Sequence, residues 1–131
     1  MKGRWFEEFA VGQHYRTGSR TLTEAEIVTF ARQYDPQIIH TDPDGAAQSQ
    51  YGGIIASGLQ TLATTFLLFF DAEIFGEAFE VGVGADEMRW TKPVRPGDSL
   101  TAEVEVLEAR PSRSQPHCGL VKTRIRALNQ N

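Results

Sequence analysis

The sequence predicts an α+β domain in which an antiparallel sheet wraps around one apolar helix. Apolar residues recur at helical spacing in the first half of the chain and alternate in steps of two in the second half. Between these halves lies the most apolar run, "GGIIASGLQTLATTFLLFF", which is apolar around most of its circumference. A helix of that kind is normally enclosed by other structure, so we expect it at the centre of the fold.

A first helix is predicted from Thr23 to about Tyr34. Thr23 and Glu26 have the spacing of a capping box, which marks the start of the helix. Pro36 ends it, because the residue before a proline is pushed out of helical geometry. One face of this helix carries the apolar residues Ile27, Phe30, Ala31 and Tyr34.

Two more helices are expected between the first helix and the strands of the second half. Asp42 is a suitable N-cap with Pro43 in the first helical position, so a short helix is predicted to run to about Gln50. The central apolar helix is predicted from about Ala56 to Phe70.

Strands are predicted in "VGVGADEMRW", "DSLTAEVEVLEA" and "CGLVKTRIRAL", with one more in "GQHYRTGSR" near the start. The second and third of these alternate between an apolar face and a charged face, so one side of the sheet is buried. The outer charges match across an antiparallel pair, and the expected register places Glu105 opposite Lys122 and Glu103 opposite Arg124.

Composition limits the class of protein. A chain of 131 residues fits a single domain, 1–131. The net charge of -4 provides no field for a nucleic acid. The lone Cys118 and an N-terminus without a signal stretch favour the cytoplasm. The apolar run contains Ser57, Gln60 and three threonines and lacks flanking basic residues, so no membrane span is expected.

The stretch "YDPQIIHTDPDGAAQSQYGGIIASG" contains the candidate catalytic groups. Asp35 and His40 are close enough in sequence to share a cavity, where the carboxylate would orient the ring and either group would carry a proton. The free N–H groups at the start of the apolar helix suit a developing oxyanion. The residues alone leave the simpler interpretation open, in which Asp35 terminates a helix and the glycines relieve close packing.

The same stretch resembles the signature of MaoC-like (R)-specific enoyl-CoA hydratases and dehydratases, roughly F-A-x-x-[ST]-G-D-x-N-P-[IL]-H-x-D followed by G-x-[IL]-[AV]-H-G-M. The run from Met88 to Asn131, with its P-V-x-x-G-D turn, also resembles this family. The resemblance implies a hotdog fold, usually dimeric or a higher homo-oligomer, with acyl-CoA in a tunnel at the subunit interface. It also implies that Asp35 and His40 are catalytic and that the Gly58 N–H polarises the thioester carbonyl.

Departures from the family pattern concern the substrate. Gln37 stands in place of Asn, Ile38 in place of Pro, Tyr34 in place of Gly, and Ser57 in place of His. We count Gln37 and Ser57 with Gly58 as candidate substrate-binding residues. Family members often continue beyond the position of Asn131 into one more strand, and an absent final strand would leave an exposed edge of the sheet.

The resemblance implies reversible hydration of a trans-2-enoyl-CoA to an (R)-3-hydroxyacyl-CoA, in fatty acid metabolism. No metal or cofactor is expected beyond the CoA of the substrate, because His14, His40 and His117 lack ligand spacing. Two alternatives stay open. A hotdog thioesterase commonly has its catalytic acid on the central helix, and residues 57–70 contain no Asp or Glu. The other is a non-catalytic acyl-CoA-binding hotdog protein.

Overall fold

The computed structural model describes residues 3–131. In chain order it contains the 3-10 helix η1 (Phe6–Glu8), strand β1 (His14–Thr21), helices α1 (Glu24–Tyr34), α2 (Ile38–Thr41), α3 (Pro43–Ala47) and α4 (Gly58–Asp71), the 3-10 helix η2 (Gly76–Ala78), and strands β2 (Ser99–Pro111) and β3 (Gly119–Leu128).

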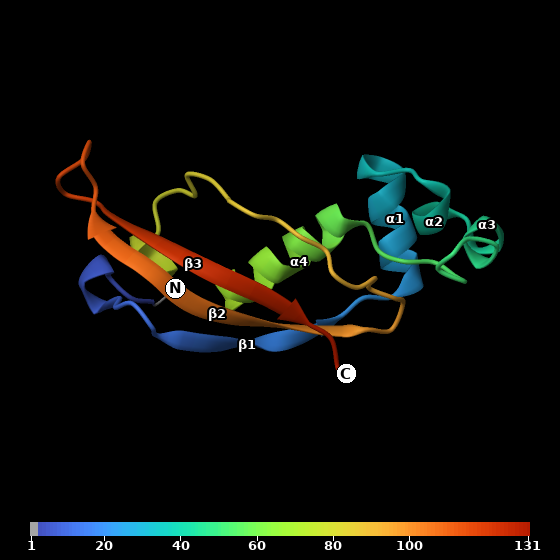
Figure 1. The fold of residues 1–131 in the computed structure, drawn as a ribbon, viewed down its shortest axis with the longest axis horizontal. Helices are drawn as coiled ribbons and strands as arrows, with labels where there is room; N and C mark the ends of the chain where they lie inside the picture. Colours follow the sequence, from blue (N-terminus) through green and yellow to red (C-terminus); the bar gives the residue numbers. More distant parts are fainter. Residues whose placement is uncertain (1–2) are drawn as a thin grey trace.

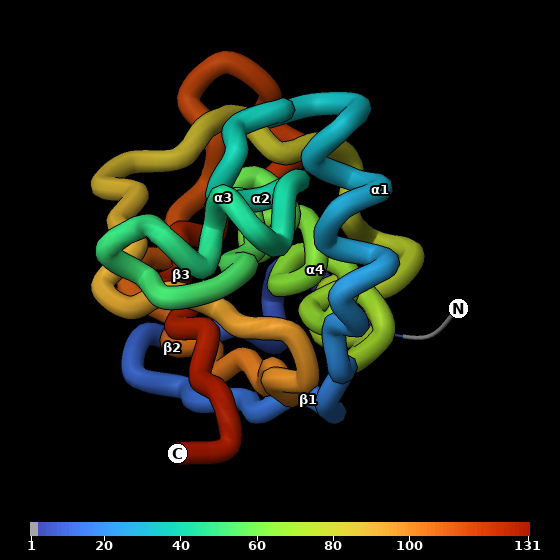
Figure 2. The backbone as a smooth tube through the Cα atoms, turned by 90° about the vertical axis from the view of Figure 1, so that its right-hand side faces the viewer, coloured from blue at the N-terminus to red at the C-terminus, as the bar shows by residue number. Residues whose placement is uncertain are grey.

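The strands form an antiparallel sheet in the order β1-β2-β3, and α4 lies along one of its faces (Figure 1). Helices α1, α2 and α3 gather at one end of the molecule, beyond the start of α4, as the end-on view in Figure 2 also shows. The predicted α+β arrangement is therefore confirmed. The first turn of α4 points at the helical end, which places the stretch around Asp35 beside it.

Local sequence explains the helix boundaries. The Thr23 hydroxyl accepts a hydrogen bond from the Glu26 N–H at 3.2 Å, and the Glu26 carboxylate accepts from the Thr23 N–H, so the predicted capping box is present. Asp42 caps α3 through the Asp44 N–H, as predicted, but α3 ends at Ala47 rather than near Gln50.

The sheet buries one face against α4. Leu100, Ala102, Val104 and Val106 are each at most 2% exposed, which confirms the alternation predicted for this strand. Val104 and Val106 pack in one cluster with Phe69 of α4. Burial of a large apolar side chain contributes about 1.5 to 3 kcal/mol relative to exposure, so this face supplies much of the stability of the fold.

The predicted register between β2 and β3 was wrong by two residues. Glu105 lies opposite Arg124, with Nη1 and Oε1 3.2 Å apart, and Glu103 lies opposite Arg126. A register shift between Val106 and Glu108 brings Glu108 opposite Lys122. A shift of two positions keeps every side chain on its predicted face, so the hydrophobic pattern could not distinguish the two registers.

The strand predicted in "VGVGADEMRW" was also wrong, because residues 81–90 have no assigned strand structure. Glu87 has a φ of 52°, in the left-handed region, which interrupts an extended conformation. Segment 79–97, which makes up nearly all of the connection from η2 to β2, instead runs back past α4 (Figure 1). Its Asp86 carboxylate lies 3.4 Å from the Lys122 ammonium on β3.

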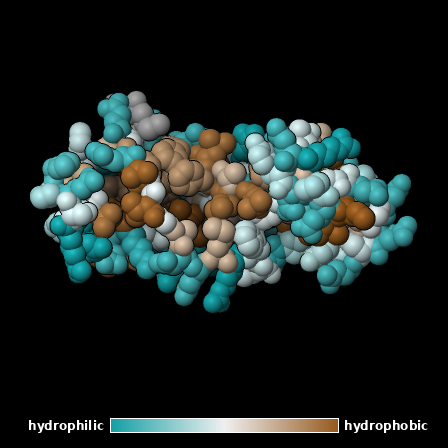
Figure 3. Space-filling view, turned by 90° about the horizontal axis from the view of Figure 1, so that it is seen from above, coloured by the Kyte–Doolittle hydropathy of each residue, from teal (hydrophilic) through white to brown (hydrophobic). Residues whose placement is uncertain are grey.

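Apolar side chains gather on one face of the molecule (Figure 3). The large apolar side chains that are more than 40% exposed on α4 and segment 79–97 are Leu59, Leu62, Phe66, Leu67, Val81, Val83, Met88 and Trp90. Within residues 3–131, no helix is both long enough and apolar enough to span a bilayer.

Candidate active site

The end of α1 and the short helix α2 bring Asp35 and His40 together. Asp35 is the C-cap of α1 with a φ of −158° and a ψ of 70°, so its side chain leaves the helix direction just before Pro36. The chain then turns into α2, which was not predicted as a helix, and His40 lies within it. His40 is only 5% exposed, so α2 turns the imidazole into the protein.

The imidazole is held by two groups. Its Nδ1 lies 2.7 Å from the carbonyl oxygen of Ile55, and a carbonyl oxygen can only accept, so Nδ1 carries the hydrogen. Its Nε2 faces the Asp35 Oδ2 at 3.4 Å. With Nδ1 protonated, Nε2 is the atom that exchanges a proton, and it does so beside a carboxylate.

Two further donors fix the Asp35 carboxylate. The Gln37 Nε2 donates to Oδ1 at 2.8 Å, and the Ser57 Oγ donates to Oδ2 at 2.7 Å. These hydrogen bonds, the Gln37 bond first and then the Ser57 bond, together with the neighbouring His40, lower the pKa of the Asp35 carboxyl despite its partial burial. Asp35 is therefore held as an anion at neutral pH.

The first turn of α4 lies next to this carboxylate. Ser57 is the N-cap of α4, and its Oγ accepts a hydrogen bond from the Leu59 N–H at 3.2 Å while donating to Asp35. The Gly58 N–H makes no hydrogen bond within residues 3–131, as expected at the first position of a helix. An unpaired donor at the positive end of a helix suits a partial negative charge.

The structure thus brings together all five predicted site residues at one end of α4. Ser57 is completely buried, and its hydroxyl is used within the protein, so Ser57 positions Asp35. Gln37 is exposed and also contacts Asp35. Gly58 is half-buried. The roles predicted for Gly58, Gln37 and Ser57 toward a substrate remain predictions.

Sequence reasoning missed Trp90. Its indole Nε1–H donates to the carbonyl oxygen of Gly58 at 3.0 Å. A Cβ atom added to Gly58 would lie 2.5 Å from the Trp90 ring, so the indole covers the Cα of that glycine. In the sequence, Gly58 indicated that another part of the chain packs closely against this position. Nothing near it in the sequence indicated that the contacting residue is Trp90.

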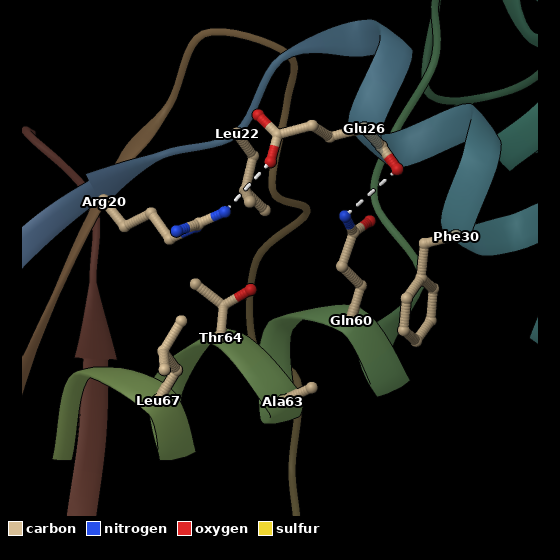
Figure 4. Close-up of a pocket in the computed structure, with 8 residues that line it drawn as sticks. All are labelled: Arg20, Leu22, Glu26, Phe30, Gln60, Ala63, Thr64 and Leu67. Atoms are coloured by element: carbon tan, nitrogen blue, oxygen red, sulfur yellow. Dashed lines mark hydrogen bonds and ion pairs between the residues drawn. The ribbon is translucent and has the colours of Figure 1, made fainter. Parts of the chain in front are cut away.

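A separate cavity lies between α1, α4 and the end of β1 (Figure 4). Its volume is about 170 Å³, and it contains neither Asp35 nor His40. The Gln60 Nε2 donates to the Glu26 carbonyl oxygen at 3.3 Å, whereas the Gln60 Oε1 is buried without a partner in the described part of the chain. The residues that line it are Arg20, Leu22, Glu26, Phe30, Gln60, Ala63, Thr64 and Leu67.

Comparison with known proteins places this arrangement in a family. The family described as MaoC like domain matches residues 7–127. The chain belongs to the MaoC-like family. It is 36% identical to the uncharacterized protein YdeM of Bacillus subtilis over 124 residues, 95% of this chain and 86% of that protein.

Solved structures agree with this assignment. A MaoC-like dehydratase from Rhodospirillum rubrum superposes with a TM-score of 0.90 at 36% identity, covering 98% of this chain and 87% of that one. The R-hydratase PhaJ1 from Pseudomonas aeruginosa has a TM-score of 0.72 at 28% identity, covering 95% of this chain and 75% of that one. The hotdog fold implied by the sequence resemblance is thereby confirmed.

Proposed function

We propose that this MaoC-like protein is a hydro-lyase that reversibly hydrates a trans-2-enoyl-CoA to an (R)-3-hydroxyacyl-CoA. The observation that carries the proposal is the Asp35–His40 pair beside the unpaired Gly58 N–H. A base for water and a donor for the thioester oxygen are the two functions that this addition requires. Membership of a family with hydratase members supports the same reaction.

The proposed reaction starts with a water molecule that donates a hydrogen bond to Asp35 and contacts the Nε2 of His40. The water oxygen adds to C3 of the enoyl group and gives one proton to the Asp35–His40 pair. The electrons of the C2=C3 bond move to the thioester oxygen, which accepts a hydrogen bond from the Gly58 N–H. The pair then returns a proton to C2, so that the elements of one water are added.

Three features of the dyad favour this assignment. The hydrogen bond to the Ile55 carbonyl fixes the tautomer and orientation of the His40 ring, and in this orientation Nε2 faces Asp35. Gln37 and Ser57 keep Asp35 ionised and oriented. The low exposure of His40 limits competition from bulk water. The proposed reaction uses no cofactor besides the CoA of its substrate.

The test is to mix the purified protein with crotonyl-CoA and follow the loss of the conjugated-thioester absorbance, with free thiol measured in parallel. Loss of absorbance without thiol release is expected. The product is then separated on a chiral column to verify the (R) configuration. Absence of hydration across short, branched and long enoyl-CoA substrates would contradict the proposal.

A hotdog thioesterase is the competing function, and thiol release in the same assay would establish it. Helix α4 extends to Asp71, one residue beyond the predicted end, so it does contain one carboxylate. Asp71 is at the far end of the helix, about 20 Å along the axis from Gly58 at 1.5 Å per residue. It therefore lies too far from the free Gly58 N–H to attack a thioester that this group binds.

We further propose that the protein is a cytoplasmic homodimer or higher homo-oligomer. The support is the exposed apolar surface of α4 and segment 79–97 (Figure 3), since soluble monomers rarely expose a large contiguous apolar patch. Sedimentation equilibrium checks the assembly, and a mass of 14.6 kDa at micromolar concentration would identify a monomer.

A further inference from the structure

We propose that Trp90 is a specificity-determining residue whose indole contacts the acyl group of the substrate next to the thioester carbonyl. This inference rests on the proposed function. It assigns a role to a residue of segment 79–97, which lies outside the stretch that carries the dyad.

The first step is the position of the ring. The Trp90 Nε1–H bonds to the Gly58 carbonyl oxygen at 3.0 Å, and the ring covers the Cα of the same glycine. These two contacts fix the indole over the residue whose N–H is the proposed oxyanion donor. A thioester oxygen bound to that N–H lies on the N-terminal side of Gly58, and its acyl group reaches the indole across the Cα of this glycine, which carries no side chain.

The second step is accessibility. Trp90 is 52% exposed in the single chain and belongs to the apolar surface assigned above to contact between subunits, so part of the ring is anchored on α4 while the rest faces the space at that contact. Neighbouring Leu59 is 47% exposed, which extends this apolar wall along the first turn of the helix. The dyad lies on the Ser57 side of Gly58, because Ser57 binds Asp35 directly.

The third step is chemistry. Asp35 and His40 supply charge and hydrogen bonds, which act on C3 and C2 of any enoyl thioester. They do not discriminate between acyl groups of different width. A rigid aromatic side chain next to the carbonyl excludes wider acyl groups by steric contact. A difference of one methyl group in such a pocket changes kcat/KM by about 10- to 200-fold. Trp90 therefore sets the width of the acyl site while the dyad performs the chemistry.

The variants Trp90→Ala and Trp90→Phe test the proposal by the ratio of kcat/KM for 2-methylcrotonyl-CoA to that for crotonyl-CoA. Trp90→Ala removes the wall and is expected to raise the ratio about tenfold. Trp90→Phe keeps a smaller ring and loses the bond to Gly58, so an intermediate change is expected. Val11→Ala, a change at a 67% exposed position outside α4 and segment 79–97, is the control and leaves the ratio unchanged.

A binding measurement provides a readout independent of turnover. The chain has two tryptophans, so the variant Trp5→Phe leaves Trp90 as the single indole reporter. Titration with butyryl-CoA, which is saturated and cannot be hydrated, is expected to change the Trp90 fluorescence, with binding confirmed by calorimetry. Free CoA, which lacks the acyl group, is expected to change it much less.

The outcomes separate the two proposals. The role of Trp90 alone is overturned if folded Trp90→Ala hydrates crotonyl-CoA with an unchanged ratio of kcat/KM values for the two substrates. It is also overturned if butyryl-CoA binds by calorimetry without changing the Trp90 fluorescence. Binding with a fluorescence change but without turnover overturns the hydratase function and leaves the acyl contact standing. If the unmodified protein neither hydrates any of the enoyl-CoA substrates nor binds butyryl-CoA, both proposals fail.

Discussion

The two ends of α4 differ in chemistry although they belong to one continuous helix. At the N-terminal end, Ser57 and the Gly58 N–H meet a carboxylate and an imidazole. At the C-terminal end, the surroundings are aromatic, with Phe69 against Phe75 at 5.0 Å and Phe70 against Phe79 at 5.2 Å between ring centroids. The polar end holds groups that exchange protons, and the aromatic end holds the helix on the sheet.

The difference between the two ends shows how a small domain remains stable although its polar site lowers stability. Buried charges and unpaired donors cost stability, and the aromatic end offsets that cost with buried area and edge-to-face ring contacts. The division predicts that substitutions at the polar end change rate more than stability, whereas those at the aromatic end change stability more than rate.

The largest effect is expected for Asp35→Asn at the polar end. The substitution keeps the shape of the side chain but removes its charge and its ability to take a proton, so kcat for crotonyl-CoA should fall by about 10²- to 10⁴-fold. Steady-state kinetics measure the loss, and circular dichroism verifies that the variant is folded. His40→Ala should reduce kcat over the same range. A near-normal rate in either variant would remove the dyad from the mechanism.

The next effect is expected for Phe69→Ala at the aromatic end. Phe69 is 3% exposed, so the substitution leaves a cavity and should lower the free energy of unfolding by about 3 to 5 kcal/mol. Urea denaturation measures this change, with substrate turnover followed on the protein that remains folded. Trp5→Ala is the control truncation of an aromatic side chain, because Trp5 is 65% exposed, lies outside the apolar surface assigned to subunit contact and should cost about 1 kcal/mol. Equal losses in the two variants would refute the assigned packing.

The smallest effect is a change in pH dependence when the donors to Asp35 are removed. Gln37→Leu and Ser57→Ala each delete a hydrogen bond that lowers the Asp35 pKa, so the acidic limb of the kcat/KM profile should move to higher pH. The shift should be larger for Gln37→Leu, since the Gln37 bond is the stronger cause. An acidic limb at the same pH in both variants would show that Asp35 does not govern it.

The ionised Asp35 carboxyl stabilises the folded state, and this stabilisation depends on pH. Its pKa is lower in the folded protein than in the unfolded chain, so the unfolded state binds the proton more tightly. The resulting stabilisation is fully present above the ordinary pKa of an unfolded aspartate and is lost as the pH falls through the lower pKa of the folded state. Ser57→Ala reduces this acid-side dependence.

Local patterns predicted the parts of the fold that depend on neighbours in sequence. The capping box at Thr23, the stop before Pro36 and the alternation of β2 are short-range features, and each was confirmed. The candidate site was also predictable, because the spacing of Asp35, His40 and Gly58 is contained in one stretch of chain. The resemblance to the family selected the catalytic interpretation of these residues.

The parts that could not be predicted depend on partners far away in the chain. Glu105 pairs with Arg124 rather than Lys122, and this displacement of two positions leaves each side chain on its predicted face, so the hydrophobic pattern does not encode it. The left-handed Glu87 breaks a segment whose alternation resembles a strand. Trp90 reaches Gly58 across 32 positions of sequence, and no local pattern encodes that contact.

The Ser57 hydroxyl has a consequence for spectroscopy. One oxygen atom both starts α4, through the Leu59 N–H, and stabilises the charge on Asp35. Fraying of the first turn therefore withdraws a hydrogen bond from the carboxylate, and the carboxylate becomes easier to protonate. The titration of Asp35, followed by the NMR chemical shift of its carboxyl carbon, therefore reports whether the first turn of α4 is formed.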